Sequence, residues 1–545
     1  MTFDAFTKSI VDRFCTLLPN EWELSADYTI KFFTKRDVSA FFRDIGGDLD
    51  KASAQAIYAL SPETFLSNVL GVAELPSIPS EQQPARSASD YAVKEWWKQK
   101  YLQPEDPLVD FVMLNRLADL IIRMSPQLKR ALRFTYPYVF IDEFQDTTYA
   151  QYSFLKSVFA HAGTTVTAVG DPNQRIMGWA GALGNAFAEF EVDFKAEPFK
   201  FKSNFRSSQK LVDLQHRFAI RLDPKSPLQH SRVNTPVGET PVSVWSFPNE
   251  ECEADAVAAW IAADMETSGR SPANYGLIAR QEVAKLEPQL SRALSAFGLR
   301  LRNDDAKVGE LRLQDLLTDD LVRLLLGILT LAVNKVGQPQ AWHDVTSTLA
   351  RMSSSGSRTR DARARVDTNL TAYLRILRSW MAVTPLNDDS SGDFVDDAAR
   401  SLIDQLTTFV RVAAAGHKRL LGDRPEDLQV TLDAFRIRLV QTLGRVDSWI
   451  AVPEAFFDAD AVPLLTVHRS KGLEYHTVFF IGLDKEQWWA HTRNTIESTM
   501  TFFVGVSRAA ECLIFTQCDQ RGEPAPLGDL YQDLKDAGVS LIRFD

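Results

Sequence analysis

The sequence predicts an α/β protein with parallel sheets, and two observations lead to this fold class. Short apolar runs rich in β-branched and aromatic residues, at Tyr138–Ile141 and 164–169, end abruptly in polar residues, which is typical of buried strands. The order strand, helix, strand at 241–247, 251–265 and 275–280 is the pattern of a parallel sheet. Sheets of this kind alternate with helices along the chain.

Length and composition indicate a globular protein of several domains. The chain has 545 residues, which corresponds to roughly three or four domains of about 150 residues each. It is 45% hydrophobic and 24% charged, an ordinary composition for a soluble protein. The net charge of −11 argues against a protein that coats nucleic acid over its whole surface, but positive charge can be confined to one groove. Charge therefore neither supports nor excludes DNA binding.

Cysteine spacing and apolar runs argue against other classes of protein. No CxxC pair occurs, so neither a zinc site nor a disulfide framework is expected. We expect reduced, mostly buried thiols at all four cysteines: Cys15, Cys252, Cys512 and Cys518. The longest apolar run, 324–333, is half of the roughly 20 residues that a membrane span needs, and the chain does not start with a signal peptide. A cytoplasmic protein without membrane contact is predicted.

Taken in order, the chain first predicts a helical region of about 130 residues. Its first helix is indicated by apolar residues that share one face: Phe3, Phe6, Ile10, Phe14 and Leu17. A stretch rich in Pro and Ser at 75–84 predicts a surface loop, and the pattern at 110–124 predicts another helix. Residues 300–455 are also mostly helical in pattern. Strands at 464–467, 477–483 and 512–516 are expected to complete a second sheet.

Two carboxylates, Asp142 and Glu143, directly follow the run Tyr138–Ile141. In open α/β sheets, ligands bind at the carboxyl ends of the strands. Magnesium prefers a few carboxylate oxygens, waters and substrate phosphates, so Asp142 can hold the ion while Glu143 orients a water as general base. The alternative is an ordinary helix N-cap followed by first-turn acids.

The second apolar run, 164–169, ends in Gly-Asp-Pro-Asn-Gln at 170–174. Gly, Pro and Asn predict a tight turn, which leaves Gln174 as an uncharged group able to bond a phosphate oxygen or a water. Trp179 follows, flanked by Gly178 and Gly181, an unusual place for a core residue. Taken alone, each of these loops is more often structural than functional.

Together, Ile-Asp-Glu-Phe-Gln-Asp at 141–146 and Gly-Asp-Pro-Asn-Gln…Trp-Ala-Gly-Ala at 170–182 closely resemble motifs II and III of superfamily 1 DNA helicases of the UvrD/Rep/PcrA type. Further blocks follow in that family's order. Asn-Phe-Arg-Ser at 204–207 resembles motif IV. The block Leu-Thr-Val-His-Arg-Ser-Lys-Gly-Leu-Glu at 465–474 resembles motif V, and Phe-Val-Gly-Val-Ser-Arg-Ala at 503–509 resembles motif VI. Thr-Phe-Asp-Ala-Phe at 2–6 is similar to motif Ib. Several motifs in the right order form a strong signal.

The resemblance implies two RecA-like parallel-sheet motor domains, the first of them incomplete, with mostly helical inserted domains. The implied division is motor domain 1A at 1–12 and 105–200, insertion 1B at 13–104, motor domain 2A at 201–300 and 456–545, and insertion 2B at 301–455. Within 2B, the arginine-rich segment 352–365 fits a phosphate-contacting loop and a solvated helix start equally well.

The resemblance also implies ATP and Mg²⁺ as cofactors, with single-stranded DNA and duplex junctions as partners. Its nucleotide site would comprise Asp142 as the metal ligand, Glu474, and four catalytic residues: Glu143, Gln174, Arg206 and Arg508. For the two arginines, the alternative is an ordinary surface pair with a carboxylate. DNA would be bound by Trp179, on which bases stack, and by Thr466 and His468 at the backbone.

The sequence departs from the family in three places. The family has an aromatic at the position of Met177 and an arginine at that of Ala180, so two DNA contacts are absent. No Gly-Lys dipeptide occurs in the 545 residues, although a phosphate-cradling loop needs Gly-x-x-x-x-Gly-Lys-Ser/Thr. The family places this loop before motif Ib, where this sequence begins. Three explanations stay open: a true start upstream, a partner chain that supplies the loop, or a degenerate helicase that no longer hydrolyses ATP.

The sequence thus predicts an ATP-dependent DNA helicase or translocase that acts on single-stranded DNA in repair, recombination or defence. The alternative is a catalytically inactive, helicase-like DNA-binding or scaffold subunit that needs a partner or the missing loop.

Overall fold

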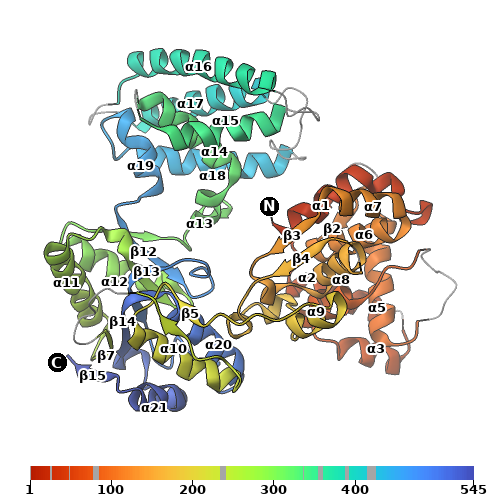
Figure 1. Cartoon of the computed structure of the whole chain (residues 1–545), viewed down its shortest axis with the longest axis horizontal. Coiled ribbons are helices and arrows are strands. Elements are labelled where there is room, and N and C mark those ends of the chain that lie inside the picture. The colour runs from red at the N-terminus through yellow and green to blue at the C-terminus, as the bar shows by residue number, and fades with distance from the viewer. Residues whose placement is uncertain are drawn as a thin grey trace. The chain divides into compact units, whose positions relative to one another are not determined.

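The computed structural model describes most of the chain, in two compact units (Figure 1). It describes residues 2–24, 28–47, 49–77, 85–161, 163–233, 241–334, 337–353, 360–386, 392–413 and 425–544, without the side chains of 179, 351, 353, 360–363 and 425–427. Unit 1 comprises Met1–Lys202, Phe218–Leu228 and Asn494–Phe503, and unit 2 comprises Ser203–Arg217, Gln229–Arg493 and Val504–Asp545.

Unit 1 is mainly helical, as the sequence predicts. Its longer helices are α1 (Phe3–Phe14), α2 (Lys35–Gly47), α3 (Lys51–Tyr58), α5 (Ala88–Trp97), α6 (Phe111–Met124), α7 (Pro126–Thr135), α8 (Tyr149–Phe159) and α9 (Ala186–Phe194). Helix α6 is the centre of this unit, because ten of its residues are buried. It begins where the buried Asp110 carboxylate accepts a hydrogen bond from Met113 N at 2.8 Å, and it packs against α1 and α8. Short strands β1 (Thr29–Ile30) and β2 (Leu108–Val109) pair in parallel beside it.

The second sheet of unit 1 consists of two parallel strands, β3 (Tyr138–Ile141) and β4 (Thr165–Ala168). Val139 and Ile141 pack against the helical core of the unit. Because side chains alternate along a strand, Tyr138 and Phe140 point to the opposite face, where they are 67% and 76% exposed. The prediction of a buried strand at Tyr138–Ile141 is therefore wrong for one face of this sheet. The apolar core of unit 1 lies against the other face alone.

Unit 2 contains a seven-stranded parallel sheet in the order β15-β7-β14-β13-β8-β12-β9. The strands are β7 (Val242–Phe247), β8 (Tyr275–Ala279), β9 (Arg300–Asn303), β12 (Ala461–Thr466), β13 (Tyr475–Ile481), β14 (Ala509–Cys518) and β15 (Ser540–Arg543). Helices α11 (Glu250–Ser268) and α12 (Val283–Ser295) cover one face through a shared apolar core. Helix α21 (Gly528–Asp536) also belongs to unit 2, and β5 (Ser203–Asn204) pairs with β6 (His230–Ser231). Helices α10 (Gln209–Leu222) and α20 (Thr495–Val506) each contain residues of both units, because Phe218–Leu228 and Asn494–Phe503 belong to unit 1. The predicted α/β class with a parallel sheet is confirmed.

The predicted helical region after residue 300 forms a separate bundle in unit 2, after the hairpin of β10 (Lys307–Val308) and β11 (Leu311–Arg312) (Figure 1). Its helices are α13 (Leu313–Thr318), α14 (Asp320–Val333), α15 (Pro339–Ser353), α16 (Arg360–Val383), α17 (Gly392–Ala413), α18 (Pro425–Leu443) and α19 (Val452–Phe457). They enclose their own apolar core, to which the run 324–333 contributes. Within the arginine-rich segment 352–365, residues 354–359 and the side chains of 353 and 360–363 lie outside what the structure describes. The four-domain division itself stays a prediction.

Two further expectations concern cysteines and membranes. All four cysteines are free, as predicted, but only Cys518 is buried, whereas Cys15, Cys252 and Cys512 are partly exposed. The expectation of mostly buried thiols therefore holds for one residue.

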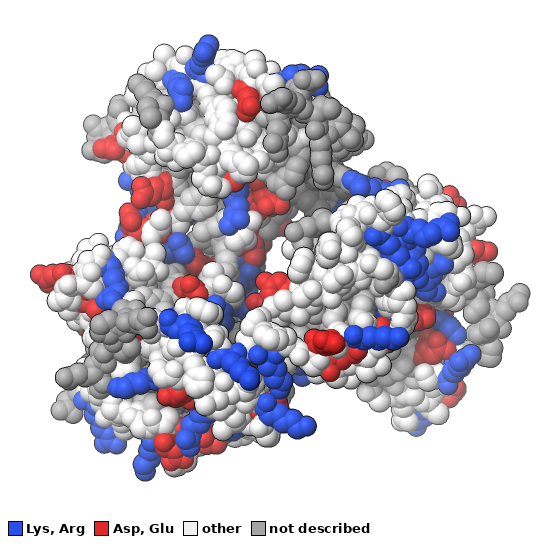
Figure 2. All heavy atoms as spheres, in the orientation of Figure 1, with Lys and Arg blue, Asp and Glu red and all other residues white. Residues whose placement is uncertain are grey.

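Among the helices in the described ranges, none is long and apolar enough to cross a membrane. On the face drawn in Figure 2, basic side chains form separate groups between acidic ones, which fits a chain with a net charge of −11.

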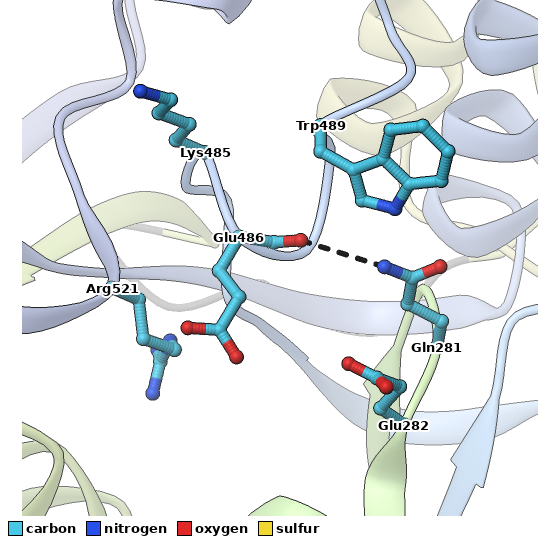
Figure 3. A pocket seen from close by; sticks show the side chains of 6 residues that line it. All are labelled: Gln281, Glu282, Lys485, Glu486, Trp489 and Arg521. Atoms are coloured by element: carbon cyan, nitrogen blue, oxygen red, sulfur yellow. Dashed lines mark hydrogen bonds between the residues drawn. The ribbon is translucent and has the colours of Figure 1, made fainter.

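The carboxyl ends of β8 and β13 border a cavity of about 580 Å³ (Figure 3). Its lining residues are Gln281, Glu282, Lys485, Glu486, Trp489 and Arg521. Gln281 and Glu282 start the connection from β8 to α12, and the loop after β13 supplies the next three residues. This edge of a parallel sheet is the usual place for a ligand.

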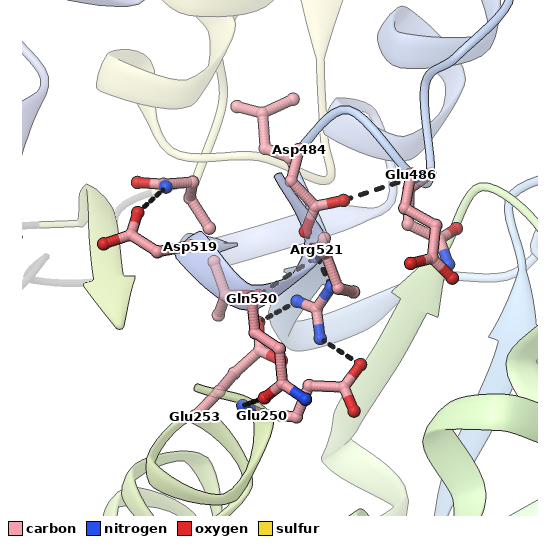
Figure 4. A network of polar contacts seen from close by, with 12 residues as sticks. Glu250, Glu253, Asp484, Glu486, Asp519, Gln520 and Arg521 are labelled. Carbon is pink, nitrogen blue, oxygen red and sulfur yellow. Dashed lines mark hydrogen bonds and ion pairs between the residues drawn. The ribbon is translucent and has the colours of Figure 1, made fainter. Parts of the chain in front are cut away.

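The lining residue Arg521 is also the centre of a buried ion network (Figure 4). The Arg521 guanidinium is 2% exposed and contacts Glu253 at 2.6 Å, Asp484 at 2.7 Å and Glu250 at 3.3 Å. Arg521 follows β14, Asp484 follows β13, and both glutamates lie in the first turn of α11. One arginine thus ties together three connections at the carboxyl edge of the sheet.

We expect the aromatic residues of unit 1 to differ sharply in their contribution to stability. Phe154 in α8 is 1% exposed and meets Phe3 and Phe6 edge to face, whereas Phe140 is 76% exposed. Phe154→Ala should lower the free energy of unfolding by about 3–5 kcal/mol because it leaves a cavity, and Phe140→Ala by less than about 1 kcal/mol. Urea unfolding of both variants tests this. Equal losses would contradict the exposed face of β3.

Replacing Arg521 should destabilise unit 2 in a pH-dependent way. Burial raises the pKa of Asp484 to about 6 even with Arg521 beside it, and removal of the guanidinium raises that pKa further. A carboxylate whose pKa is raised by folding destabilises the fold as pH increases through that pKa. Arg521→Met should therefore cost about 3–5 kcal/mol at pH 8 and less at pH 5, measured by urea unfolding. Arg400→Met removes an exposed arginine, and its small effect should not change with pH in this way.

Candidate functional site

The first group of predicted site residues lies where β3 and β4 end. Strand pairing matches Ile141 with Ala168, so the two following loops leave the sheet side by side. Asp142 and Glu143 are both exposed, and Asp142 Oδ1 accepts a hydrogen bond from Glu143 N at 2.8 Å. Glu143 adopts the left-handed conformation, with φ 52° and ψ 38°. For a residue other than Gly this backbone is strained, and such strain is concentrated at functional sites.

The side chain of Gln145 joins the two loops. Its Nε2 donates to Glu143 Oε2 at 2.5 Å, and its Oε1 accepts from Asp171 N at 3.0 Å. Gln145 is only 2% exposed, which holds the amide in place. A Cβ atom at Gly170 would collide with Gln145 Oε1 in this position, so a larger residue there would displace the Gln145 amide from its two partners. Gln145 was not among the predicted site residues, because a single amide has no spacing pattern that reveals its partners.

The turn after β4 fixes Gln174. Asp171 Oδ1 accepts from Asn173 N at 2.9 Å, and Asp171 Oδ2 accepts from Gln174 Nε2 at 3.1 Å. A continuous series of hydrogen bonds therefore runs from Glu143 through Gln145 and Asp171 to Gln174. The structure thus links the predicted residues Glu143 and Gln174 through Gln145 and Asp171, and the tight turn predicted at 170–174 is present.

The acidic pair fits a magnesium site of the kind that is completed by substrate. Mg²⁺ keeps several waters and takes one or two carboxylates together with phosphate oxygens. Asp142 and Glu143 supply that number of carboxylates at a strand end. Within the described ranges, no group of three or more His, Cys, Asp or Glu side chains is placed to hold a metal by protein ligands alone.

The second group lies in unit 2, where three sequence-distant segments converge. Arg206 Nε donates to Glu474 Oε2 at 2.6 Å, and Arg206 Nη1 donates to Ser507 O at 3.2 Å. Arg508 is 2% exposed, and its guanidinium donates to Val504 O, Leu473 O and Ser507 Oγ. The structure thus brings Arg206, Glu474 and Arg508 together around Ser507.

Each arginine of this group has a different environment. Arg206 and Glu474 have side chains that are 35% and 64% exposed, so water screens their ion pair and the pair adds little stability. This pairing is the alternative that the sequence left open for the arginines. Arg508 instead fixes the segments that hold Arg206, because it bonds backbone oxygens on both sides of the cluster.

The predicted DNA contacts Thr466 and His468 lie at and just after the end of β12. His468 is exposed, and Ser470 N closes the turn by donating to Thr466 O at 3.0 Å. Arg469 forms a two-pronged ion pair with Asp315 of α13, and Gln314 Nε2 donates to Arg469 O at 3.0 Å. Helix α13 therefore holds this loop, a contact that sequence spacing did not reveal.

Trp179 belongs to a short 3₁₀ turn, Gly178–Ala180. Its side chain lies outside the part of the chain that the structure describes, so its predicted role as a stacking surface stays a prediction.

Comparison with known proteins gives matches at both ends of the chain. The family model of the UvrD/REP helicase N-terminal domain matches residues 1–195, and the family model of the UvrD-like helicase C-terminal domain matches residues 399–520.

Several helicases are similar over most of this chain. DNA helicase II of Escherichia coli is 24% identical over 478 residues, which cover 79% of this chain and 63% of that protein. The ATP-dependent DNA helicase Rep of Escherichia coli is 22% identical over 76% of this chain and 65% of Rep. The ATP-dependent DNA helicase PcrA of Leuconostoc citreum is 21% identical over 76% of this chain and 58% of PcrA. The chain spans less than two thirds of the length of each of these relatives. The two domain matches and the similarity along 76–79% of the chain establish that it belongs to the UvrD/Rep/PcrA family of superfamily 1 helicases.

Proposed function

We propose that this protein is an ATP-dependent DNA helicase or translocase that moves on single-stranded DNA. The observation that carries the proposal is the series of hydrogen bonds from Glu143 through Gln145 and Asp171 to Gln174. A purely structural loop does not need a strained acidic residue held against a second polar turn at the ligand edge of a sheet.

In this mechanism, Asp142 would hold Mg²⁺, and the ion would supply positive charge beside the triphosphate. Glu143 accepts the proton of the attacking water, and Gln145 fixes the direction of the Glu143 carboxylate. Gln174 responds to the γ-phosphate through its amide. General-base catalysis of this type contributes about 10²–10⁴-fold to a rate.

Arg206 and Arg508 are the proposed cationic groups for the phosphate that leaves. Arg206 is paired with Glu474 at 2.6 Å, so a phosphate has to compete with a carboxylate for its guanidinium. This competition gives Glu474 a role: it holds Arg206 in position when nucleotide is absent. Arg508, buried and bonded to backbone oxygens, keeps this arrangement rigid and adds positive charge.

We assign single-stranded DNA and duplex junctions as partners, with Trp179, Thr466 and His468 at the strand. Contacts of this type grip DNA without reading sequence, which suits a motor. Repair, recombination or defence in the cytoplasm is the proposed setting.

One observation favours a second candidate function. No Gly-Lys dipeptide occurs in these 545 residues, so they hold no phosphate loop of the Gly-Lys-Ser/Thr type. In this candidate the chain is a DNA-binding or scaffold subunit that does not hydrolyse ATP without such a loop from a partner.

DNA-stimulated ATP hydrolysis separates the two candidates. The protein is purified from its own source through a tag after residue 545, which retains upstream residues and bound partners. We expect hydrolysis that single-stranded DNA stimulates, and a loss of roughly 100-fold or more in Glu143→Gln, which keeps the shape but removes the base. Binding of single-stranded DNA without any hydrolysis in the natural form would favour the second candidate.

Gln145 should act on the rate of hydrolysis more than on nucleotide binding. Gln145→Ala removes both hydrogen bonds that orient Glu143 and the Asp171 turn. We expect kcat to fall about 10- to 100-fold, with KM for ATP and single-stranded DNA affinity nearly unchanged. Steady-state kinetics tests this, with Gln340→Ala, an exposed glutamine of α15, as control. A large rise in KM with constant kcat would contradict the role assigned to Gln145.

A further inference from the structure

A single turn of π-helix in unit 1, Phe65–Leu70, meets the loop that carries Trp179. We call it the π turn, and it has no role in the function proposed above. A Cβ atom at Gly181 would lie 2.7 Å from Ser67 Cβ and 3.1 Å from Ser67 Cα, so the two backbones approach closely. Turns of π-helix are rare and are often found at functional sites.

The contact depends on small residues on both sides. Gly181 has φ 88° and ψ 22°, a left-handed conformation that side chains rarely adopt, and Ser67 occupies the space where a Cβ would stand. Ser67 is 9% exposed, and its short side chain reaches back to Glu63 O, with Oγ at 3.5 Å. A larger side chain at position 67 therefore has to displace Gly181 or the π turn itself.

The π turn is the rigid side of this contact. Phe65 is fully buried, and its ring centroid lies 5.2 Å from that of Phe42 and 5.5 Å from that of Trp96. Leu70, at the other end of the turn, is also fully buried. Because close-packed cores yield little, a larger residue at position 67 pushes the Trp179 loop rather than the π turn.

The loop that carries Trp179 is a compact turn that moves as a piece. Ala180 N donates to Met177 O at 3.0 Å, and Gly181 N donates to Gly178 O at 3.1 Å. Because Trp179 stands inside this closed turn, a shift of Gly181 moves the backbone of Trp179 with it.

The residues after Gly181 are attached to the predicted nucleotide site. Leu183 N donates to Thr147 O at 2.9 Å, and Ala182 pairs with Thr148 in an antiparallel bridge. Thr147 and Thr148 end the same connection that carries Glu143. The loop is therefore held between the π turn on one side and the acidic connection on the other.

We propose that Ser67 is a positioning residue for Trp179. Its contact with Gly181 sets where Trp179 stands, and thereby how tightly the loop binds single-stranded DNA. This inference rests on the proposed function, because it needs Trp179 as a DNA contact. Ser67 itself lies outside every helicase-like block of the sequence, in the helical region 13–104, and touches no DNA in this role.

The test is binding of an end-labelled oligothymidylate to the 545-residue chain, measured by fluorescence anisotropy at fixed salt. Trp179→Ala should weaken binding roughly 5- to 150-fold, because a stacking surface is lost. Ser67→Leu should weaken it by about 5-fold or more, up to the loss in Trp179→Ala, and Ser67→Val by less. Ser67→Ala keeps the space for Gly181 and should bind like the natural chain.

A double-mutant cycle separates positioning from general structural damage. In the Trp179→Ala background, Ser67→Leu should cause no further loss, since the side chain through which Ser67 acts is gone. Asn68→Leu is the matched control, because Asn68 belongs to the same turn but is exposed, and it should bind like the natural chain. Overpacking also lowers stability, so thermal unfolding is recorded for each variant, and Ser67→Val carries the test if Ser67→Leu does not fold.

The possible outcomes separate this inference from the proposed function. If Trp179→Ala weakens binding but the Ser67 variants bind like the natural chain, the positioning role is refuted while the proposed function stands. The same holds if the loss in Ser67→Leu persists in full without Trp179. If the natural chain does not bind single-stranded DNA, or Trp179→Ala binds it equally well, the proposed DNA contact fails and the positioning role falls with it.

Discussion

The parallel pairing of strands is the constraint on which the rest of this structure depends. Every strand of a parallel sheet ends at the same edge, so each return crosses over through a helix or a longer connection. The buried strand residues, such as Leu277 and Phe479, stabilise the sheet through apolar burial. The connections at the carboxyl edge are then free to carry polar side chains. Asp142 and Glu143 in unit 1, and Thr466 and His468 in unit 2, lie at this edge, whereas Glu474 and Arg508 directly precede β13 and β14 at the opposite edge.

Polar side chains that each contact several partners hold those connections in place. Arg521 fixes three connections in unit 2, and Gln145 fixes two loops in unit 1. At the base of the helical bundle, Asp458 forms an ion pair with Arg300 at 2.9 Å and lies within 3.5 Å of Arg438 and Arg445. Burying a charge costs free energy, and these partners offset the cost. Such networks are therefore better understood as fixing geometry than as sources of stability.

Local pattern and motif order predicted much of this molecule. The strands at 242–247, 275–279 and 475–481 and the helical region after residue 300 follow from periodicity, which depends on neighbouring residues. What the sequence did not reveal depends on tertiary contacts. The apolar run that contains Tyr138 and Phe140 does not show whether a second layer of structure covers these two side chains. The pairing of Arg206 with Glu474 joins residues 268 positions apart, which no local pattern indicates. Gln145 stood inside a recognised motif, yet its two partners became visible only with the loops in space.

The proposed nucleotide residues of unit 1 and the proposed DNA contacts of unit 2 are held in place independently of each other. The acidic pair is held by Gln145 and Asp171, which are contacts within unit 1, whereas the Thr466 loop is held by contacts within unit 2. Each surface is therefore preorganised by its own unit and needs no ligand at the other to form. Neither surface therefore has to be created when a ligand binds. In the proposed function, Arg206, which pairs with Glu474, is the residue through which a bound phosphate would change how strongly each ordered surface is used.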